Sequence, residues 1–377
     1  MAIGEIAPAL LEDWLRDRYF QARLDISCSG VETYSLGEVR AMLGLGWEEL
    51  DLIDFRDSPS LGSQELREAV AARFAPGHAG KVMVTSGSSE AIFLSMTALI
   101  RPGDEIVVMR PVYQSLVSIA EALGARLKVW ELPGSFVPDL GPLRGLLTPR
   151  TRAIVVNFPH NPTGTTLTPG QYQDLLELVS EHGCHLFWDG AFAELVYDEP
   201  PLPDPAGVLG RCVSFGTLSK AYGLPGLRVG WCFAPRELLA EMVRVRDYLT
   251  LNLSPLNDAI AAAVLRDAGR FLTPRMEQAR QGRDLLLQWA REHADLVSLP
   301  VPRGGVSAFP RLKSLADVTD LCTRLARDHG VLVVPGRCFG HADRIRVGFG
   351  GSLGQLKEGL WLLAAQARRA KGASDGV

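Results

Sequence analysis

Apolar residues along the chain follow two spacings, and their alternation predicts a layered α/β domain. Stretches with an apolar residue every three or four positions indicate helices, and short continuous apolar runs indicate strands that are buried on both faces. We expect helices over 63–75, 88–100, 114–123 and 169–182, and strands over 82–85, 105–109, 126–131, 153–157, 185–189, 211–216 and 228–233. Strands that alternate with helices in this way are typical of a mostly parallel sheet covered by helices.

The two ends of the chain follow a different pattern. Residues 3–22 have apolar side chains at helical spacing, and a Ser- and Gly-rich segment, DISCSGVETYSLGE, follows them. After residue 235 the chain is mainly helical to 295, and short strands are then expected over 297–300, 305–309, 331–334 and 344–349, before a helix that begins at 353. We therefore expect an N-terminal arm with part of the small domain over 1–45, a large domain over 46–271 and a smaller α+β domain over 272–377.

Composition and charge narrow the class of partner. The chain has 377 residues and a net charge of −4, which gives no general attraction to nucleic acid or to an anionic membrane. No apolar run reaches the length of about 18 residues that a membrane span needs. We expect a small-molecule ligand in a pocket. The cysteines form no CxxC pair, which favours a cytoplasmic protein without disulfides.

A cluster of possible metal ligands is better explained as a helix end. His182, Cys184 and His185 lie close together in the sequence. Gly183, which stands among them, is typical of the residue that ends a helix, and no further ligand cluster accompanies them. We therefore expect a turn here and no metal site.

The segment SFGTLSKAYGLPGLRVGW contains the strongest chemical signal. Lys220 follows an expected strand and stands near the hydroxyls of Thr217 and Ser219, and Arg228 follows eight residues later. This arrangement suits a lysine amine that forms an imine while its neighbours bind a phosphate. The alternative is a solvated surface lysine, but the glycines around Lys220 provide a tight backbone that a surface lysine does not need.

Three further motifs follow predicted strands. NFPHNPTG places Asn161 after the strand over 153–157, and FWDGAF places Asp189 at the end of the next strand. Open α/β sheets bind ligands at these carboxyl ends, although an Asn-Pro turn and a helix cap are the simpler alternatives. VTSGSSEA predicts a strand, a turn and a helix, so the backbone N–H groups at 87–89 provide a phosphate cradle.

Together, and in this order, the four signals resemble the fold-type I pyridoxal-phosphate (PLP) enzymes, specifically the class I/II aminotransferase family. The resemblance implies an aspartate aminotransferase-like fold for the large domain, with PLP as the cofactor. It implies that Lys220 forms a Schiff base with PLP, that Asp189 keeps the pyridine nitrogen protonated and that Asn161 bonds the ring oxygen O3′. The residues that match the family's other cofactor-binding positions are Gly87, Ser88, Ser89, Tyr113, Thr217, Ser219 and Arg228.

The C-terminal segment DRIRVGFGG matches the position at which this family binds the α-carboxylate of its substrate. Arg346 is the matching residue, and a guanidinium group can bind a carboxylate through two parallel hydrogen bonds. Arg344, two residues away, is the alternative. The resemblance also implies a homodimer that acts on an amino acid.

The N-terminal segment departs from ordinary aminotransferases. With WLRDRYFQ before it, DISCSGVETYSLGEVR resembles the PLP cyclases that convert 3-hydroxyarginine to capreomycidine in antibiotic biosynthesis. The implied reaction removes the α-proton, eliminates the 3-hydroxyl as water and adds a guanidine nitrogen at C3. The alternatives are an idiosyncratic dimer arm and an aminotransferase for an arginine-like or aromatic amino acid.

The same segment supplies the expected contacts to the substrate. Ser29 and Gly30 are candidate substrate-binding residues. Residues 27–37 have the character of a lid over the site, with a static arm as the alternative. The carboxylate that binds the guanidinium stays open among Glu12, Asp13, Asp25, Glu32 and Asp57.

Overall fold

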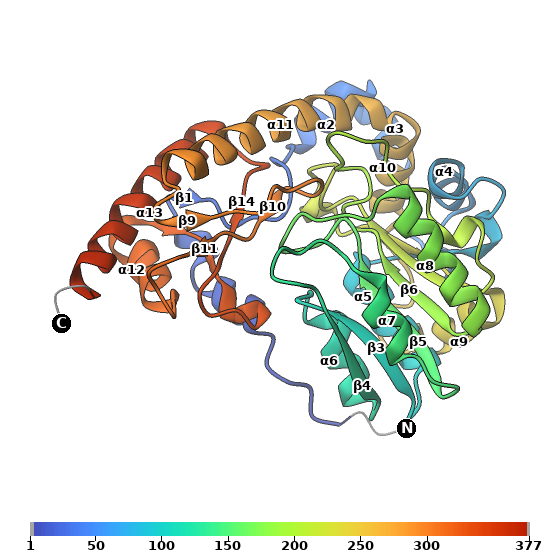
Figure 1. Ribbon diagram of the computed structural model, residues 1–377. Helices are drawn as coiled ribbons and strands as arrows, with labels where there is room; N and C mark the ends of the chain where they lie inside the picture. Colours follow the sequence, from blue (N-terminus) through green and yellow to red (C-terminus); the bar gives the residue numbers. More distant parts are fainter. Residues whose placement is uncertain (1–3, 375–377) are drawn as a thin grey trace.

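The computed structural model describes residues 4–374, and a seven-stranded sheet lies at the centre of its larger part (Figure 1). In their order across the sheet, the strands are β2 (Val82–Thr85), β8 (Gly230–Phe233), β7 (Cys212–Thr217), β6 (His185–Asp189), β5 (Thr151–Asn157), β3 (Glu105–Arg110) and β4 (Arg126–Glu131). Strand β8 runs antiparallel to both of its neighbours, and the other pairs are parallel. The mostly parallel sheet that the sequence predicts is confirmed.

Both faces of this sheet are buried. Along β5, Ala153 and Val155 belong to one cluster of buried side chains, and Ile154 and Val156 belong to the other. Successive side chains of a strand point to opposite faces, so burial on both sides produces the continuous apolar runs seen in the sequence. One face is covered by α5 (Ser88–Leu99), α6 (Ser115–Ala122) and α9 (Arg236–Arg246), and the other by α4 (Gln64–Phe74), α7 (Leu140–Leu146), α8 (Pro169–His182) and α10 (Pro255–Arg266).

Helix α8 shows how local sequence sets the ends of an element. The Thr168 side chain accepts a hydrogen bond from Gln171 N, and the Gln171 side chain accepts one from Thr168 N. Pro169 occupies the first turn, where its missing N–H costs nothing. The helix ends at Gly183, whose φ of 72° lies in the left-handed region that favours glycine. Both ends agree with the prediction from the sequence.

The predicted strand over 228–233 begins too early. Arg228 has a φ of 52°, which no strand residue adopts, and β8 therefore begins at Gly230. Such a backbone is unusual for a residue with a side chain, and at Arg228 it coincides with the expected phosphate site. The first residue of β8 is therefore set by the backbone conformation at the expected phosphate site and not by the spacing of apolar residues.

A smaller unit is built around a three-stranded antiparallel sheet of β10 (Ser307–Ala308), β14 (Ile345–Gly348) and β13 (Val334–Pro335). Two further pairs are β1 (Leu24–Asp25) with β12 (Val331–Leu332), and β9 (Val297–Ser298) with β11 (Arg311–Leu312). The helices of this unit are α11 (Ala268–Glu292), α12 (Thr319–His329) and α13 (Leu353–Ser374). Figure 1 shows α11 running from α10 towards α13, so the expected domain boundary at 271/272 falls inside a continuous helix.

The N-terminal helix is shorter than the predicted one over 3–22. Helix α1 comprises Leu10–Arg16, and residues 4–9 are not helical. Gly4 and Pro8 are poor helix formers, and Gly4 N instead donates a hydrogen bond to Ala122 O at the end of α6, at 2.8 Å. Residues 4–9 therefore follow the surface of the large unit before α1 begins, and residue 3 of the predicted helix lies outside the described residues.

Residues 23–35, which we call the N-terminal connector, are hydrogen-bonded to both units. Leu24 N donates to Gly330 O in the small unit, at 2.9 Å. In the large unit, Val31 N donates to Lys220 O at 3.1 Å, and Tyr34 N donates to Gly223 O at 3.0 Å. A Cβ on Gly348 would collide with Cys28 O, so the connector packs directly against β14.

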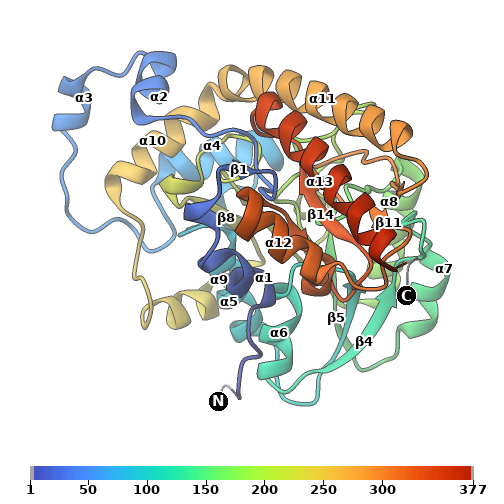
Figure 2. The same ribbon diagram turned by 90° about the vertical axis from the view of Figure 1, so that its left-hand side faces the viewer.

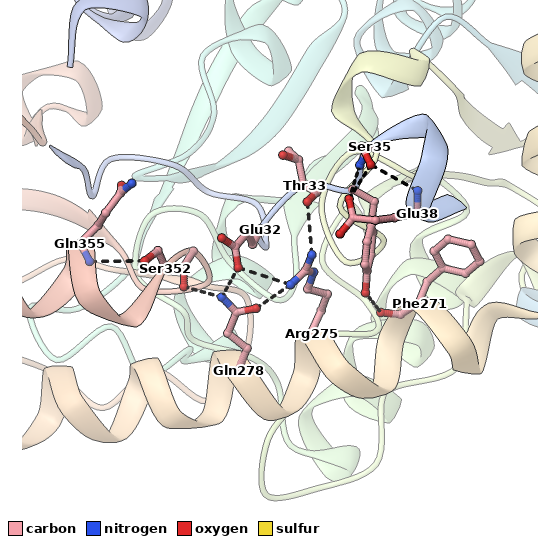
Figure 3. Close-up of polar contacts among 11 residues, drawn as sticks. Glu32, Thr33, Ser35, Glu38, Phe271, Arg275, Gln278, Ser352 and Gln355 are labelled. Atoms are coloured by element: carbon pink, nitrogen blue, oxygen red, sulfur yellow. Dashed lines mark hydrogen bonds and ion pairs between the residues drawn. The ribbon is translucent and has the colours of Figure 1, made fainter. Parts of the chain in front are cut away.

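Side chains fix the connector to α11 as well. Figure 3 shows Glu32 beside Arg275 and Gln278 of that helix. The Glu32 carboxylate lies 3.4 Å from Arg275 Nη1 and accepts a hydrogen bond from Gln278 Nε2 at 2.6 Å. The segment expected to be a lid over 27–37 is therefore an integral part of the fold in this structure, because its removal would break bonds to both units.

The remaining elements are short. After the connector, α2 (Leu36–Leu43) and α3 (Trp47–Asp51) project from the body of the molecule (Figure 2). Single 3₁₀ turns occur at η1 (Tyr19–Gln21), η2 (Ala79–Lys81), η3 (Pro205–Gly207), η4 (Pro225–Leu227) and η5 (Gly336–Phe339). Within residues 4–374, no helix combines the length and the apolar character that crossing a membrane requires.

Candidate active site

The polar residues singled out in the sequence lie at one edge of the sheet because parallel strands end there together. Strand β5 ends at Asn157, β6 ends at Asp189 and β7 ends at Thr217. The register pairs Asn157 with Asp189, and Asn157 Nδ2 donates a hydrogen bond to Asp189 O at 2.9 Å. The loops that leave these strands carry Asn161 and Lys220. This edge is where open α/β sheets bind ligands.

A cavity of about 430 Å³ opens at this edge. Its wall combines loops of the large unit with α1, the connector and β14, so it lies between the two units. Every predicted site residue except Gly30 lines it. The predicted residues in the wall are Ser29, Gly87, Ser88, Ser89, Tyr113, Asn161, Asp189, Thr217, Ser219, Lys220, Arg228 and Arg346.

Gly30 lies behind the cavity wall. A Cβ at this position would come within 3.1 Å of Ser219 O. The next residue, Val31, donates its N–H to Lys220 O. Glycine thus lets the connector approach the backbone that carries the lysine. In this structure Gly30 supports the lysine loop, and its contact with the substrate stays a prediction.

Lys220 faces the cavity with its amine. Its Nζ donates a hydrogen bond to Ser29 Oγ at 2.9 Å and lies 5.7 Å from the centre of the Phe192 ring. Burial lowers the pKa of the Lys220 amine, and the positive charge of Arg346 lowers it further. A lowered pKa favours the neutral amine, which is the form that acts as a nucleophile or a base.

Asp189 is a buried carboxyl group at the floor of the site. Only 5% of the residue is exposed, and burial raises its pKa to about 6. Ala191 N donates to Asp189 Oδ1 at 3.0 Å, which stabilises the charged form in part. The raised pKa means that the carboxylate lacks a sufficient cationic partner within the protein. A protonated ring nitrogen of a bound ligand would supply that partner.

The start of α5 and Arg228 form an anion cradle. Gly87 precedes this helix with a φ of 77°, and a Cβ there would lie 2.5 Å from Arg228 Nη2. A Cβ on Gly230 would lie 2.5 Å from Ser88 N. Both glycines therefore let a guanidinium group and the backbone N–H groups of a helix N-terminus come together. This combination suits a phosphate dianion.

Arg346 is buried in the wall with one guanidinium nitrogen unused. Its Nη2 donates to Ser27 O at 2.9 Å, and its Nη1 donates to Asn161 Oδ1 at 3.3 Å. Among the described residues, its Nε is buried without a hydrogen-bond partner. An unpaired buried donor of a charged group costs free energy, so this geometry favours a bound anion such as a carboxylate.

Arg344, the alternative left open by the sequence, points elsewhere. Its Nη1 donates to Phe309 O at 2.9 Å, and its guanidinium lies 4.5 Å from the centre of the Phe136 ring. It is absent from the cavity wall, which contains Arg346. The structure thus places Arg346, the residue that matches the family's position, in the cavity wall and Arg344 outside it.

Sequence reasoning passed over two buried residues that hold the loops of the site. Asn157 Oδ1 accepts a hydrogen bond from Asn161 N at 2.8 Å. The His160 side chain bonds to Pro111 O through Nε2, and so connects this loop to the one that carries Tyr113. Both residues belong to NFPHNPTG, so their place between a strand end and a turn was the available signal.

The fold agrees with comparisons to known proteins. A family model for aminotransferase class I and II matches residues 55–361. The chain belongs to this family. Capreomycidine synthase of Streptomyces vinaceus is 54% identical over 93% of this chain and 92% of that protein. An aspartate aminotransferase of Rhizobium meliloti is 30% identical over 82% of this chain and 80% of that protein.

Two solved structures have nearly the same architecture as this chain. The PLP-dependent cyclase OrfR superposes with a TM-score of 0.93 at 40% identity, over 97% of this chain and 98% of that chain. A PLP-dependent aminotransferase of Streptococcus suis superposes with a TM-score of 0.91 at 27% identity, over 97% and 98% of the two chains. The aspartate aminotransferase-like fold that the motifs imply is thereby confirmed.

The cavity fits PLP, the cofactor implied by the motifs of this family. The cradle at Gly87 and Arg228 matches a phosphate, and buried Asp189 matches a protonated pyridine nitrogen. Lys220 supplies an amine of lowered pKa for the aldehyde carbon. The three features lie in one cavity wall, as a single cofactor requires.

Substitution of the two arginines gives a matched test of the carboxylate site. Arg346→Lys keeps the charge but loses the planar fork, and we expect KM for the amino-acid substrate to rise roughly 10-fold or more, because a charged hydrogen bond contributes about 1.5–3 kcal/mol. Arg344→Lys should change KM less than about threefold, since this residue lies outside the cavity. Steady-state kinetics measures KM for both variants. A larger rise in KM for Arg344→Lys than for Arg346→Lys would contradict the assignment of Arg346.

The buried His160 side chain should make the free energy of unfolding depend on pH. Burial lowers its pKa to about 4 from 6.5, and its Nδ1 accepts a hydrogen bond from Thr163 Oγ1 at 2.6 Å, so it is neutral when folded. Its contribution is complete above pH 6.5 and is lost as pH falls towards 4, because the unfolded chain then binds the extra proton. By pH 5 this loss amounts to about 2 kcal/mol.

The test compares the wild type with His160→Gln in urea unfolding at pH 7.5 and pH 5. The variant does not titrate at this position, so its free energy of unfolding should fall less on acidification, although it should be lower at pH 7.5. Every other titrating group, including the half-buried His185, is common to both proteins, so its contribution cancels in the difference. An equal fall in both proteins would show that His160 is not held neutral.

Proposed function

We propose that this enzyme of the aminotransferase family binds PLP and cyclises 3-hydroxyarginine to capreomycidine with release of water. The hydrogen bond of 2.9 Å between Lys220 Nζ and Ser29 Oγ carries this proposal. It links the lysine of the family to the N-terminal connector, the segment on which the resemblance to the cyclases rests. The identity of 54% to a capreomycidine synthase and the similarity to a PLP-dependent cyclase give further support.

The residues of the cavity have separate tasks toward the cofactor. Lys220 would hold PLP through its amine, Asp189 would keep the ring nitrogen protonated, and Asn161 would bond the ring oxygen. When bound, PLP supplies an electron-poor ring that makes the α-proton of an amino acid acidic. The residues that would hold the phosphate are Gly87, Ser88, Ser89, Thr217, Ser219 and Arg228, and Tyr113 would stack on the ring.

Lys220 is the group that moves the α-proton in this proposal. Its pKa is lowered by burial, so the amine can accept a proton from Cα and later return one. Ser29 Oγ, which accepts a hydrogen bond from Nζ, orients the amine while it carries that proton. Arg346 holds the α-carboxylate and so keeps Cα beside the lysine.

The proposed reaction is redox-neutral. The C3–O bond breaks and the hydroxyl leaves with a proton as water, while a guanidine nitrogen forms a bond to C3 and gives up one proton. The proton lost from Cα is replaced, so no electrons are gained or lost and no keto acid takes part. Bulk water has to be kept from C3, and Leu11 and Leu15 of α1 provide apolar side chains in the wall for this purpose.

We also propose a homodimer, as the resemblance implies. An apolar surface, which we define by Phe55, Tyr248, Leu249 and Leu251, is exposed on two segments of the large unit. The segments are neighbours, because Asn252 Nδ2 donates to Asp57 Oδ1 at 3.3 Å. Tyr248 is 91% exposed and Phe55 is 76% exposed. Exposed apolar clusters of this kind favour a protein partner, and a second copy is the partner that the family suggests.

A charge placed on this apolar surface should weaken the dimer. We expect the wild type to sediment as a dimer and Phe55→Asp to dissociate at least tenfold more readily, because a carboxylate would be buried without a partner. Val208→Asp is the control, since Val208 is 71% exposed and lies outside that surface. Sedimentation velocity over a range of concentrations measures both. A wild type that stays monomeric, or equal loss in both variants, would contradict the proposal.

A cytoplasmic location stays a prediction. It rests on the cysteines, all six of which lie in the described part of the chain and are free. Free thiols persist in reducing compartments and tend to pair in oxidising ones. Fractionation of the native host is the direct measurement.

The cyclase proposal is tested with purified holoenzyme and 3-hydroxyarginine. We expect one product that is lighter than the substrate by one water, formed without pyruvate or any other keto acid. In deuterated water the product should carry deuterium at Cα, because Lys220 exchanges the proton it removes. Mass spectrometry resolves both features. Stoichiometric conversion of added keto acid to its amino acid would instead establish an aminotransferase.

Lys220→Ala serves as the control for this experiment. It should lose turnover by a factor of about 10³ or more, since both the proton carrier and the anchor for the cofactor are removed. In the wild type, borohydride should fix the cofactor to Lys220, and peptide mapping should locate the label. Full turnover by Lys220→Ala would show that another residue carries the chemistry.

A further inference from the structure

The five carboxylates left open by the sequence can be separated by what each one contacts. Asp13 pairs with Arg16 at 2.7 Å, and both side chains are exposed. Glu32 is engaged by Arg275 and Gln278 on α11, as Figure 3 shows. These two carboxylates already have partners, and neither lies in the cavity wall.

The next two of the five are also outside the cavity wall. Asp25 Oδ1 accepts hydrogen bonds from Ser27 N at 2.8 Å and from Ser27 Oγ at 2.6 Å. Asp57 accepts a bond from Asn252 and lies next to the apolar surface that includes Phe55. Glu12 is therefore the remaining member of the set.

Glu12 lies in the cavity wall, on the first turn of α1. Among the described residues that line this cavity, the carboxylates are Glu12 and Asp189. Asp189 is buried at the floor, where its task is toward the ring nitrogen. Tyr113 OH donates to Glu12 Oε1 at 3.3 Å, which leaves the second carboxylate oxygen, Oε2, available to a ligand.

A cationic side chain needs a carboxylate in a wall whose other ionisable groups are mostly basic. Lys220, Arg228 and Arg346 line the wall, and the proposed function pairs Arg228 with the phosphate and Arg346 with the α-carboxylate, so none of the three attracts a guanidinium group. Against the lowering by burial, the negative charge of Glu12 raises the pKa of Lys220 and of Arg346, which means that it favours their protonated forms. Glu12 is thus close enough to the reacting end of the site to interact with a ligand there.

From these contacts we propose that Glu12 binds the guanidinium group of the substrate. The inference deepens the proposed function, on which it rests, by assigning the residue that selects an arginine-like side chain. The α-carboxylate at Arg346 and the guanidinium at Glu12 then fix the two charged ends of the substrate. Two oppositely charged contacts define the orientation of a flexible amino acid better than either one alone.

Helix α1, which carries Glu12, is hydrogen-bonded to both units. On the large unit, Leu10 N donates to Gln114 Oε1 at 3.0 Å, and Gln114 Nε2 donates to Pro8 O at 2.7 Å. On the small unit, Trp14 Nε1 donates to Val333 O at 2.8 Å. Trp14 is buried, and its anchoring keeps the helix in a single orientation. Glu12 is therefore held on a supported element, as a specificity residue requires.

The experiment compares Glu12→Gln with Asp13→Asn, a neighbour on the same helix that lies outside the cavity wall. Arginine and citrulline are the probes, because citrulline has nearly the same shape but no positive charge. Neither carries the 3-hydroxyl, so binding is read from the cofactor absorbance of the holoenzyme without cyclisation. Circular dichroism and bound cofactor confirm that each variant is folded.

We expect the wild type and Asp13→Asn to bind arginine at least tenfold more tightly than citrulline. In Glu12→Gln this ratio should fall to about one, chiefly through weaker binding of arginine, since a charge-assisted hydrogen bond is replaced by a weaker neutral one. Glu12→Asp should recover part of the ratio. A Glu12→Gln enzyme that kept the wild-type ratio, or a wild type without preference for arginine, would overturn the proposal.

The two proposals fail in distinguishable ways. If 3-hydroxyarginine gave no cyclised product but Glu12→Gln still lost its preference for arginine, the cyclase proposal would be wrong and the role of Glu12 would stand. If the cyclised product formed and the binding ratio of Glu12→Gln were unchanged, the cyclase proposal would stand and another group would bind the guanidinium. The binding ratio and the product are measured independently.

Discussion

The carboxyl edge of β5, β6 and β7 is the constraint on which the rest of the site depends. The register that pairs Asn157 with Asp189 places a carboxyl group where only 5% of the residue is exposed, and burial raises its pKa to about 6. Charged groups are costly in such surroundings unless a partner of opposite charge is present. The same packing that stabilises the sheet thus favours a cationic group in the cavity beside Asp189.

Patterns within short stretches of sequence were sufficient to predict the central sheet and the polar residues at its strand ends. The strands are buried on both faces, so their continuous apolar runs identify them, and Asp189 and Asn161 could be placed because each follows such a run. Gly183 marks the C-terminal end of α8 by capping chemistry that needs no tertiary contact. Lys220 was recognisable because short polar and glycine residues surround it in the sequence.

The parts that were missed depend on contacts between distant residues. The N-terminal connector is shaped by bonds such as Val31 to Lys220, which the spacing of apolar residues cannot reveal. Helix α12 was missed because its apolar stripe is narrow, with Leu321, Cys322 and Leu325 as its buried residues. Arg346 was chosen from the family motif, but the contact that keeps Arg344 outside the cavity, its bond to Phe309 O, is a tertiary one.

The strand-end loops and the N-terminal segments have different functions in the cavity, and this separation explains how one family fold can serve different reactions. The strand-end loops supply what both transamination and cyclisation need, namely an amine of lowered pKa, a buried carboxyl group and an anion cradle. None of these groups recognises a substrate side chain or excludes water from C3. Ser29 and Glu12, by contrast, reach the same cavity from residues before the first strand of the sheet. A change of reaction can therefore arise from substitutions in α1 and the connector that face the cavity, while the sheet and its cofactor site stay unchanged.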